Sequence, residues 1–187
     1  EGLNSYSNNA VKTAVKDIVG VQFRNTATVG GSIFGRYGFS DVLTVFSAME
    51  CYVELYKGGI VPLEQFAQSK KDNDILVRII VKKSKGCFAY QSMRNTKTDF
   101  PVIACAVSCI DGRYRASIGA RPSRAITVYD DKDIIAEDVN EASVKAFAQY
   151  VADNAPTQSN LRGSSEYRTH LIKVLVQRAI EDMKGAQ

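Results

Sequence analysis

A hairpin near the middle of the chain is the feature that most constrains the fold. Asp111 and Gly112 stand between two apolar runs, residues 100–110 and 113–119. An Asp-Gly pair in this setting is typical of a two-residue turn that joins antiparallel strands. The sequence therefore predicts two neighbouring antiparallel strands here, and a fold that contains an antiparallel sheet.

Further strands are predicted on the N-terminal side of this hairpin. A Gly-Gly pair separates the aromatic and β-branched run 51–56 from residues 60–63, which indicates a hairpin or meander. Residues 74–81 are almost continuously apolar, a pattern typical of a strand buried on both faces. Residues 87–93 give one more strand before the central hairpin.

Helices are predicted where apolar side chains recur every three to four residues. The stretches expected to be helical are 8–19, 42–49, 62–67, 141–152 and 165–183. Residues suited to N-caps are Asn8 or Asn9, Ser40 or Asp41, and Ser164 or Ser165. Helices and antiparallel strands that follow one another in blocks predict an α+β fold.

The basic run 82–86 looks like a solvated connection between two parts of the chain. We therefore expect a first domain over residues 1–83 and a second over residues 87–187, the latter an antiparallel sheet followed by helices. A chain of 187 residues is long enough for one large core or two small ones.

Composition excludes several classes of function. The formal charge of +4 comes from dispersed Lys and Arg residues, so no nucleic-acid interface is expected, although an acidic partner protein stays open. No apolar run approaches the ~18 residues that span a bilayer, and the first residues lack the pattern of a signal peptide. We expect a cytoplasmic protein without a membrane span.

Cysteine and histidine usage predicts neither a metal site nor a catalytic residue. Cys51, Cys87, Cys105 and Cys109 are too few and too irregular for a disulfide scaffold, so buried free thiols are expected. On a strand with a rise of ~3.3 Å per residue, Cys105 and Cys109 would lie about 13 Å apart, too far for one zinc ion. The single histidine, His170, falls in a helical pattern and is expected to pack or cap rather than to catalyse.

Two adjacent glycines between the first two predicted helices suggest a ligand site. Gly30 and Gly31 lie between the hydroxyl residues Thr28 and Ser32, and the carboxylate of Asp41 follows. Glycine lets a ligand approach the backbone, and successive N–H groups can bind phosphate oxygens. The alternative is a tight turn with no ligand, and the residues alone leave both interpretations open.

Five segments in consistent order resemble the FAD-binding (medium) subunit of the molybdenum hydroxylases, the xanthine dehydrogenase and carbon monoxide dehydrogenase family. They are RNTATVGGSI at 24–33, SD at 40–41, TDFPV at 98–102, GARP at 119–122 and SEYR at 165–168. The resemblance covers the whole chain and corresponds to the C-terminal two-thirds of that subunit. It implies the second part of a PCMH-type FAD-binding domain, followed by a domain similar to the CO dehydrogenase flavoprotein C-terminal domain.

The resemblance also implies a function and a set of partners. In this family, electrons from a molybdenum cofactor pass through 2Fe-2S clusters to FAD and then to an acceptor such as NAD. The molybdenum cofactor and the clusters would lie on partner subunits. This chain would be an oxidoreductase subunit that positions the flavin and carries no catalytic residue of its own.

The residues implied to hold FAD are Ala27, Thr28, Val29, Gly30, Gly31, Ser32, Ser40, Asp41, Ile75, Leu76 and Gln91. The backbone and hydroxyls of the glycine segment would contact the phosphate and ribityl portion, and Asp41 would accept from a ribityl or ribose hydroxyl. Gln91 stands near a position where family members can carry a lysine. Tyr37 and Phe39 would either lie against the flavin or, as we favour, fill the core.

One departure from the family pattern bears on function. The family begins with a domain whose own glycine-rich loop contacts the FAD pyrophosphate, and no such segment precedes Glu1. We expect either that this chain is a fragment or that another polypeptide supplies the segment. We also expect the isolated chain to be inactive. The alternative function is a cofactor-free fragment, or an assembly or interaction module. A stand-alone hydrolase or transferase has no paired nucleophile and base to support it.

Overall fold

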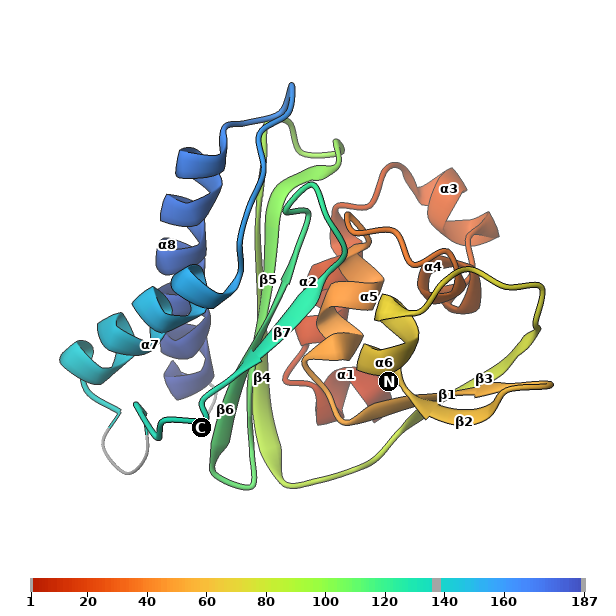
Figure 1. The fold of residues 1–187 in the computed structure, drawn as a ribbon, viewed down its shortest axis with the longest axis horizontal. Coiled ribbons are helices and arrows are strands. Elements are labelled where there is room, and N and C mark those ends of the chain that lie inside the picture. Colours follow the sequence, from red (N-terminus) through yellow and green to blue (C-terminus); the bar gives the residue numbers. More distant parts are fainter. Residues whose placement is uncertain (1, 136–138, 186–187) are drawn as a thin grey trace.

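The computed structural model describes residues 2–135 and 139–185. Helices cover both faces of a four-stranded sheet, and a smaller sheet lies beyond the N-terminal helices (Figure 1). The larger sheet consists of β4 (Gly86–Arg94), β5 (Pro101–Ile110), β6 (Arg113–Gly119) and β7 (Ile126–Tyr129). All neighbouring strands are antiparallel and follow chain order. The α+β prediction is confirmed.

The central hairpin forms where the Asp-Gly pair predicts it. Asp111 has a φ of 50° and Gly112 a φ of 81°, so both turn residues occupy the left-handed region that a two-residue hairpin turn requires. The turn sets the register of the two strands, in which Ile110 pairs with Arg113. The prediction of this hairpin is therefore confirmed.

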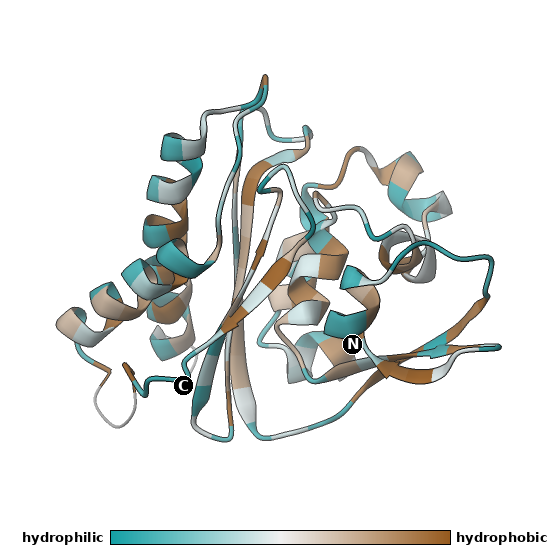
Figure 2. Ribbon diagram, in the orientation of Figure 1, coloured by the Kyte–Doolittle hydropathy of each residue, from teal (hydrophilic) through white to brown (hydrophobic). Residues whose placement is uncertain are grey.

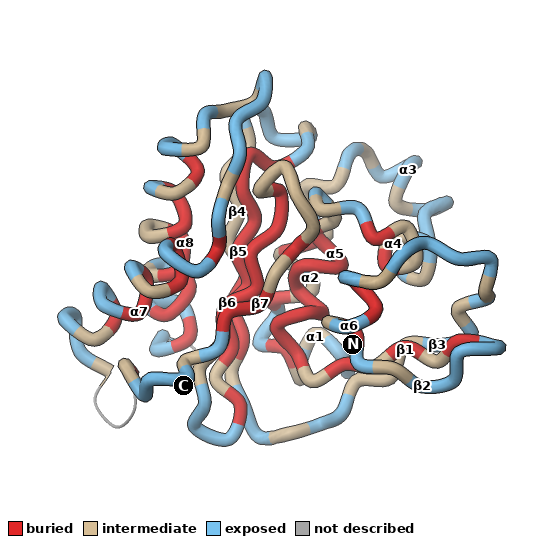
Figure 3. Tube along the Cα trace, viewed as in Figure 1, coloured by how far each residue is buried: buried red, intermediate tan, exposed pale blue. Residues whose placement is uncertain are grey.

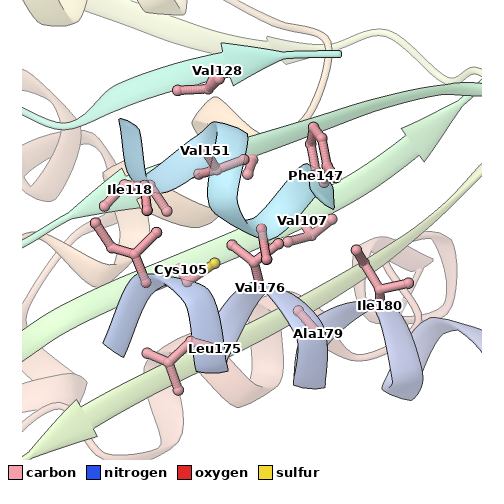
Figure 4. Close-up of a cluster of buried hydrophobic side chains, with 14 of the residues drawn as sticks. Cys105, Val107, Ile118, Val128, Phe147, Val151, Leu175, Val176, Ala179 and Ile180 are labelled. Carbon is pink, nitrogen blue, oxygen red and sulfur yellow. The ribbon is translucent and has the colours of Figure 1, made fainter. Parts of the chain in front are cut away.

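Two long helices cover one face of the larger sheet. They are α7 (Glu141–Asn154), with a capping box at Asn140 and Ser143, and α8 (Ser165–Gly185). Figure 4 shows Phe147 and Val151 of α7 and Val176 and Ile180 of α8 packed over Cys105 and Val107 of β5. This is the larger apolar cluster of the described chain, and it is closed to solvent.

The opposite face of the same sheet packs on N-terminal helices. These are α1 (Gly2–Tyr6), α2 (Ala10–Lys16) and α5 (Asp41–Ser47). Because side chains alternate along a strand, Ala104 and Ala106 face this side while Cys105 and Val107 face α8. Every residue of α5 is buried (Figure 3). Strand β5 therefore contributes to two cores.

The smaller sheet has the strand order β2-β1-β3 and packs beside two short helices, one against β1 and β2 and one against β3. Its elements are β1 (Cys51–Leu55), β2 (Gly59–Pro62), β3 (Leu76–Val81) and α6 (Leu63–Gln68). The prediction that 74–81 is buried on both faces is wrong. Among the described residues β3 pairs with β1 alone and forms an edge, and Ile75 and Val77 are 64% and 50% exposed. A continuous apolar run indicates a strand buried on both sides only where other elements cover both faces of its sheet.

Several N-terminal boundaries differ from the predicted ones. The helix expected over 8–19 is confined to α2, and the Asn9 side chain makes no cap bond. The Asn8 side chain instead accepts a hydrogen bond from the Phe88 N–H at 3.2 Å. Ser40 caps α5 as predicted, accepting from the Leu43 N–H at 3.1 Å. Two short helices, α3 (Val21–Thr26) and α4 (Val29–Phe34), stand where a loop is expected.

The cysteines and the histidine lie partly as expected. Cys51 and Cys105 are buried free thiols, and burial raises the pKa of Cys51 to about 12. Cys87 and Cys109 are only half-buried, and they lie opposite one another in the register of β4 and β5. His170 is exposed, not packed, because the buried stripe of α8 runs through Leu171 and other positions on the opposite face. No helix in the described part of the chain has the length and apolar character needed to cross a bilayer.

Candidate functional site

A cleft of about 430 Å³ opens where the N-terminal helices meet the start of β5. Residues of three stretches line it: 18–32 around α3 and α4, 37–42 at the start of α5, and 94–100 between β4 and β5. The first two belong to the predicted first domain and the third to the second. The cleft is therefore built from both parts of the chain.

The glycine segment forms the first turn of α4 rather than a loop. Thr28 is its N-cap, and the Thr28 Oγ1 accepts from the Gly31 N–H at 3.0 Å. The Ser32 Oγ donates to the Thr28 carbonyl, also at 3.0 Å. The first-turn N–H groups of Val29 and Gly30 have no partner within the helix. Of the glycine segment, Thr28, Gly31 and Ser32 line the cleft, whereas Val29 and Gly30 lie beside it. The prediction of a loop is wrong because a threonine cap can start a helix through two glycines.

The two glycines differ in the space around them. A Cβ on Gly31 would lie 3.0 Å from the Thr28 Oγ1, so a side chain there would disturb the cap. A Cβ on Gly30 would meet only the Leu76 side chain, at 3.7 Å. A side chain at position 31 would crowd the Thr28 cap, whereas Gly30 can be substituted without a clash.

Ser40 ties the two sides of the cleft together. Its Oγ accepts from the Leu43 N–H and donates to the Ser32 carbonyl at 3.1 Å. The N-terminus of α5 is thereby fixed against α4. The structure assigns Ser40 this positioning role, while a direct contact with a cofactor stays a prediction.

Asp41 is the centre of a buried polar cluster. Its Oδ1 accepts from the Arg94 Nη2 at 2.5 Å and from the Tyr90 hydroxyl, and both ion-pair side chains are less than 10% exposed. Burial, together with the charge of Asp41, raises the pKa of Tyr90 well above its ordinary value. Burial lowers the pKa of Arg94, but the hydrogen bond to Asp41 and the negative charges of neighbouring groups together outweigh it, so the pKa is raised.

Arg94 and Tyr90 are site residues that the sequence analysis missed. They lie about fifty positions from Asp41 along the chain, and no local pattern links them to it. The Arg94 Nη1 also donates to the Asp99 carbonyl at 2.5 Å, which holds the loop at the edge of the cleft. Within the described residues the Arg94 Nε is buried and lacks a hydrogen-bond partner. A buried N–H without a partner beside a cleft is a donor for a ligand.

The remaining predicted residues separate into two groups. Leu76 lies beside Gly30, and Ile75 is exposed next to it. Gln91 lies elsewhere: its Nε2 donates to the Asp182 Oδ2 at 2.5 Å on the α8 side of the sheet. Successive side chains of a strand point to opposite faces, so Tyr90 faces α5 and Gln91 faces away from the cleft.

Three aromatic side chains, Tyr37, Phe39 and Phe100, form the outer edge of the cleft. The rings of Tyr37 and Phe39 stack with centroids 5.2 Å apart, and Phe100 lies 4.4 Å from Phe39. Each side chain is between 41% and 50% exposed. The preference for a core position of Tyr37 and Phe39 is therefore wrong, because they pack on one another at the surface.

Comparison with known protein families decides the identity of both parts. Residues 2–83 match the FAD binding domain in molybdopterin dehydrogenase, and residues 88–183 match the CO dehydrogenase flavoprotein C-terminal domain. The chain belongs to the FAD-binding subunits of the molybdenum hydroxylases. FAD is the cofactor of this family, and the suspected resemblance is confirmed.

Curated proteins from two organisms are similar to this chain over most of its length. The chain is 25% identical to the putative xanthine dehydrogenase FAD-binding subunit XdhB of Escherichia coli K12, covering 95% of this chain and 67% of that protein. It is 25% identical to the uncharacterized protein YgfM of the same strain and to the glyceraldehyde dehydrogenase medium chain of Sulfolobus acidocaldarius, covering 95% and 91% of this chain. The chain spans 66% of the length of each of these last two relatives.

Solved structures share the fold of this FAD-binding subunit. Carbon monoxide dehydrogenase from Hydrogenophaga pseudoflava superposes with a TM-score of 0.87 at 21% identity, over 100% of this chain and 70% of that one. Quinoline 2-oxidoreductase from Pseudomonas putida 86 gives 0.81 at 18% identity, over 93% of this chain and 66% of that one. These likenesses confirm the arrangement of sheets and helices.

Proposed function

We propose that this chain binds part of FAD in the cleft and serves as the electron-transfer subunit of a molybdenum hydroxylase. The observation that carries the proposal is the composition of the cleft. It joins the glycine segment of the FAD-binding region to Asp99 and Phe100 of the C-terminal region, and both regions match flavoprotein families.

The residues of the cleft fit a flavin nucleotide. Thr28 and Ser32 line the cleft, where the Thr28 hydroxyl can donate to a phosphate or sugar oxygen and the Ser32 Oγ can accept from a sugar hydroxyl. The first-turn N–H groups of Val29 and Gly30 lie next to these residues in the chain. The buried Arg94 Nε offers one more donor. Ala27, Ile18 and Phe23 supply apolar surface at the same cleft. When bound, FAD supplies a ring that takes up and releases electrons.

The Asp41 cluster has a positioning role in this proposal. Because the Asp41 Oδ1 already accepts from Arg94 and Tyr90, its charge holds the Arg94 guanidinium at the cleft. We still predict that Asp41 accepts a hydrogen bond from a ribityl or ribose hydroxyl. This bond would use the carboxylate oxygen that does not bind Arg94 and Tyr90. Ser40 and Leu76 would act beside it, by fixing α5 and by covering Gly30. Gln91 would act only from outside the cleft.

The partners and the electron route are further parts of the proposal. Electrons would arrive from 2Fe-2S clusters and a molybdenum cofactor on partner subunits and would leave to an acceptor such as NAD. Relatives named as a xanthine dehydrogenase FAD-binding subunit and a glyceraldehyde dehydrogenase medium chain support this arrangement. The substrate would be chosen by the molybdenum subunit, in a cytoplasmic complex, and the chain alone would have no dehydrogenase activity.

We further propose that a segment outside this chain completes the flavin site. The relatives are about half as long again as the matched region, and apolar side chains stay exposed around the cleft. Val21, Phe23, Ile75 and Val77 are each at least 50% exposed. We also propose that the chain consists of two domains, residues 1–83 and 87–187. The additional segment would then lie next to the domain formed by residues 1–83.

A flavin titration tests the proposal. FAD added to the 187-residue chain should bind saturably but weakly, as measured by quenching of flavin fluorescence. Gly30→Val should abolish this binding without unfolding the chain, since its Cβ has room but would cover the backbone N–H groups. Gly2→Val is the matched control, because a Cβ there meets nothing within 4 Å. Absence of saturable binding would overturn the proposal in favour of a cofactor-free interaction module.

A further inference from the structure

A second cavity lies on the other side of the aromatic side chains that edge the cleft. It measures about 410 Å³ and is lined by Arg36, Arg124, Arg162 and Arg168, and we call it the arginine cavity. It shares Tyr37, Phe39 and Phe100 with the flavin cleft, but none of the glycine segment. No acidic side chain is among its lining residues in the described chain.

Two of the four arginines are deeply buried, and most of their hydrogen bonds go to neutral oxygen atoms. Arg168 is 1% exposed, and its guanidinium donates to the carbonyls of Val102, Gln158 and Gly163 and to the Asn160 side chain. Arg36 is 4% exposed and donates to the Phe66 carbonyl at 3.1 Å. Carbonyl oxygens satisfy the N–H groups of a guanidinium without neutralising its charge.

The positive charge of the cavity is only partly compensated. Arg36 has Asp72 at 3.5 Å and Arg162 has Asp99 at 3.2 Å. Among the described residues Arg124 and Arg168 have no carboxylate within ion-pair distance. Burial lowers the pKa of Arg36 and of Arg168, and a neighbouring arginine adds to the lowering in both, Arg124 in one case and Arg162 in the other. The cavity therefore carries an excess of about two positive charges in a confined space.

Two of the guanidinium groups that line the cavity have N–H donors without a partner among the described residues. The Arg162 Nε is buried and has no hydrogen-bond partner among the described residues. The described hydrogen bonds of Arg124 all come from its Nη1, to the carbonyls of Ala67, Gln68 and Ser69. Among the described residues, no hydrogen bond uses its Nε or Nη2.

We propose that the arginine cavity binds the phosphate group of a small ligand. Two uncompensated guanidinium charges match the charge of a phosphate dianion, and guanidinium groups bind phosphate through paired N–H donors. The volume exceeds that of one phosphate ion and falls in the range of small-molecule sites. Tyr37 and Phe39 offer a stacking surface for a ring attached to the phosphate.

Isothermal titration at constant ionic strength tests this site with two probes, inorganic phosphate and AMP. Both should bind saturably at one site per chain, and chloride should not. Arg162→Gln should weaken both about tenfold or more, the loss of one charge-assisted hydrogen bond. Arg178→Gln removes the same charge from an exposed position of α8 and should change nothing. Tighter binding of AMP than of phosphate would assign the aromatic side chains to the attached ring.

Two further variants keep the test clear of the flavin site and of unfolding. Gly30→Val should leave phosphate binding intact, because Gly30 lies outside the arginine cavity. Arg162 is 39% exposed, so its variant should keep the thermal midpoint of the wild-type chain. Absence of saturable binding by either probe, or equal affinity in Arg162→Gln and wild type, would overturn the proposal.

Discussion

The α7–α8 face of the larger sheet and the region around the flavin cleft use apolar side chains in opposite ways. Over the sheet, Phe147, Val151 and Ile172 are completely buried, whereas around the cleft Val21, Phe23 and Ile75 are each at least 50% exposed. Figure 2 shows hydrophobic residues in both regions, and Figure 3 shows that α3 is exposed while the inner side of α8 is buried. Exposed apolar side chains gathered at one place are typical of a binding surface.

This difference shows which region buries its apolar side chains through contacts among the described residues. The sheet with α7 and α8 owes its stability to contacts within the described residues. The cleft region has exposed apolar side chains, and we propose that FAD and the segment that completes its site cover them.

The same substitution should have very different costs in the two regions. Phe147→Ala leaves a cavity in the closed core and should lower the free energy of unfolding by about 3–5 kcal/mol. Phe23→Ala, at a side chain that is 50% exposed, should change it by no more than about 0.5 kcal/mol. Urea denaturation of the two variants measures both values. Similar costs would show that the cleft region is packed as tightly as the core.

The buried ion pair below the cleft should resemble the core in its energetics. Asp41→Asn leaves the Arg94 charge unpaired and should destabilise the chain by about 3 kcal/mol. Asp72→Asn is the control, since Asp72 is 48% exposed and its pair with Arg36 should contribute less than about 1 kcal/mol. Adding Arg94→Gln to Asp41→Asn should recover part of the loss. Equal effects of the two aspartate variants would contradict a structural role for the Asp41 cluster.

FAD should stabilise the cleft region before it affects anything else. At ten times its dissociation constant, FAD should raise the free energy of unfolding by about 1.4 kcal/mol. Hydrogen exchange should slow in α3 and α4 and stay unchanged in α7 and α8 under these conditions. Protection confined to α8 would place the flavin outside the cleft.

The smallest effect is expected at the connection between the two regions. A hydrogen bond from Lys82 lowers the pKa of Glu50 below its ordinary value of 4.5. Since the folded-state pKa is depressed, this contact stabilises the fold above pH 4.5, and the stabilisation is lost as the pH falls through the folded-state pKa. Lys82→Met should remove this part of the pH dependence, as followed by urea denaturation between pH 3 and 7. An unchanged pH profile would assign the acid sensitivity to other carboxylates.

Local patterns predicted most of the fold. The Asp-Gly pair and the apolar periodicity were sufficient for β5, β6, α7 and α8, because each signal acts over a few neighbouring residues. They were insufficient for β3, whose burial depends on which strands flank it, and for β7 (Ile126–Tyr129), a short strand that was not predicted at all.

The candidate site was predicted only in part, for a related reason. Motif order identified residues 27–32 and Ser40-Asp41, and the structure brings all of these except Val29 and Gly30 to one cleft. It placed Gln91 with them, but strand alternation turns Gln91 toward α8. It missed Arg94 because the pairing with Asp41 joins residues distant in the chain. The helix at residues 29–34 begins at a cap bond from Gly31 to Thr28 that composition does not reveal.

Strand β5 couples the unfolding of the two parts of the chain. Its alternate side chains enter both apolar clusters, so neither the N-terminal helices nor α7 and α8 can detach without exposing one side of the same strand. A protease that cuts the connection at 82–85 should therefore yield a nicked molecule whose halves stay together and melt in one transition. Unfolding of this chain is expected to be a single cooperative event, although two family regions make up its length.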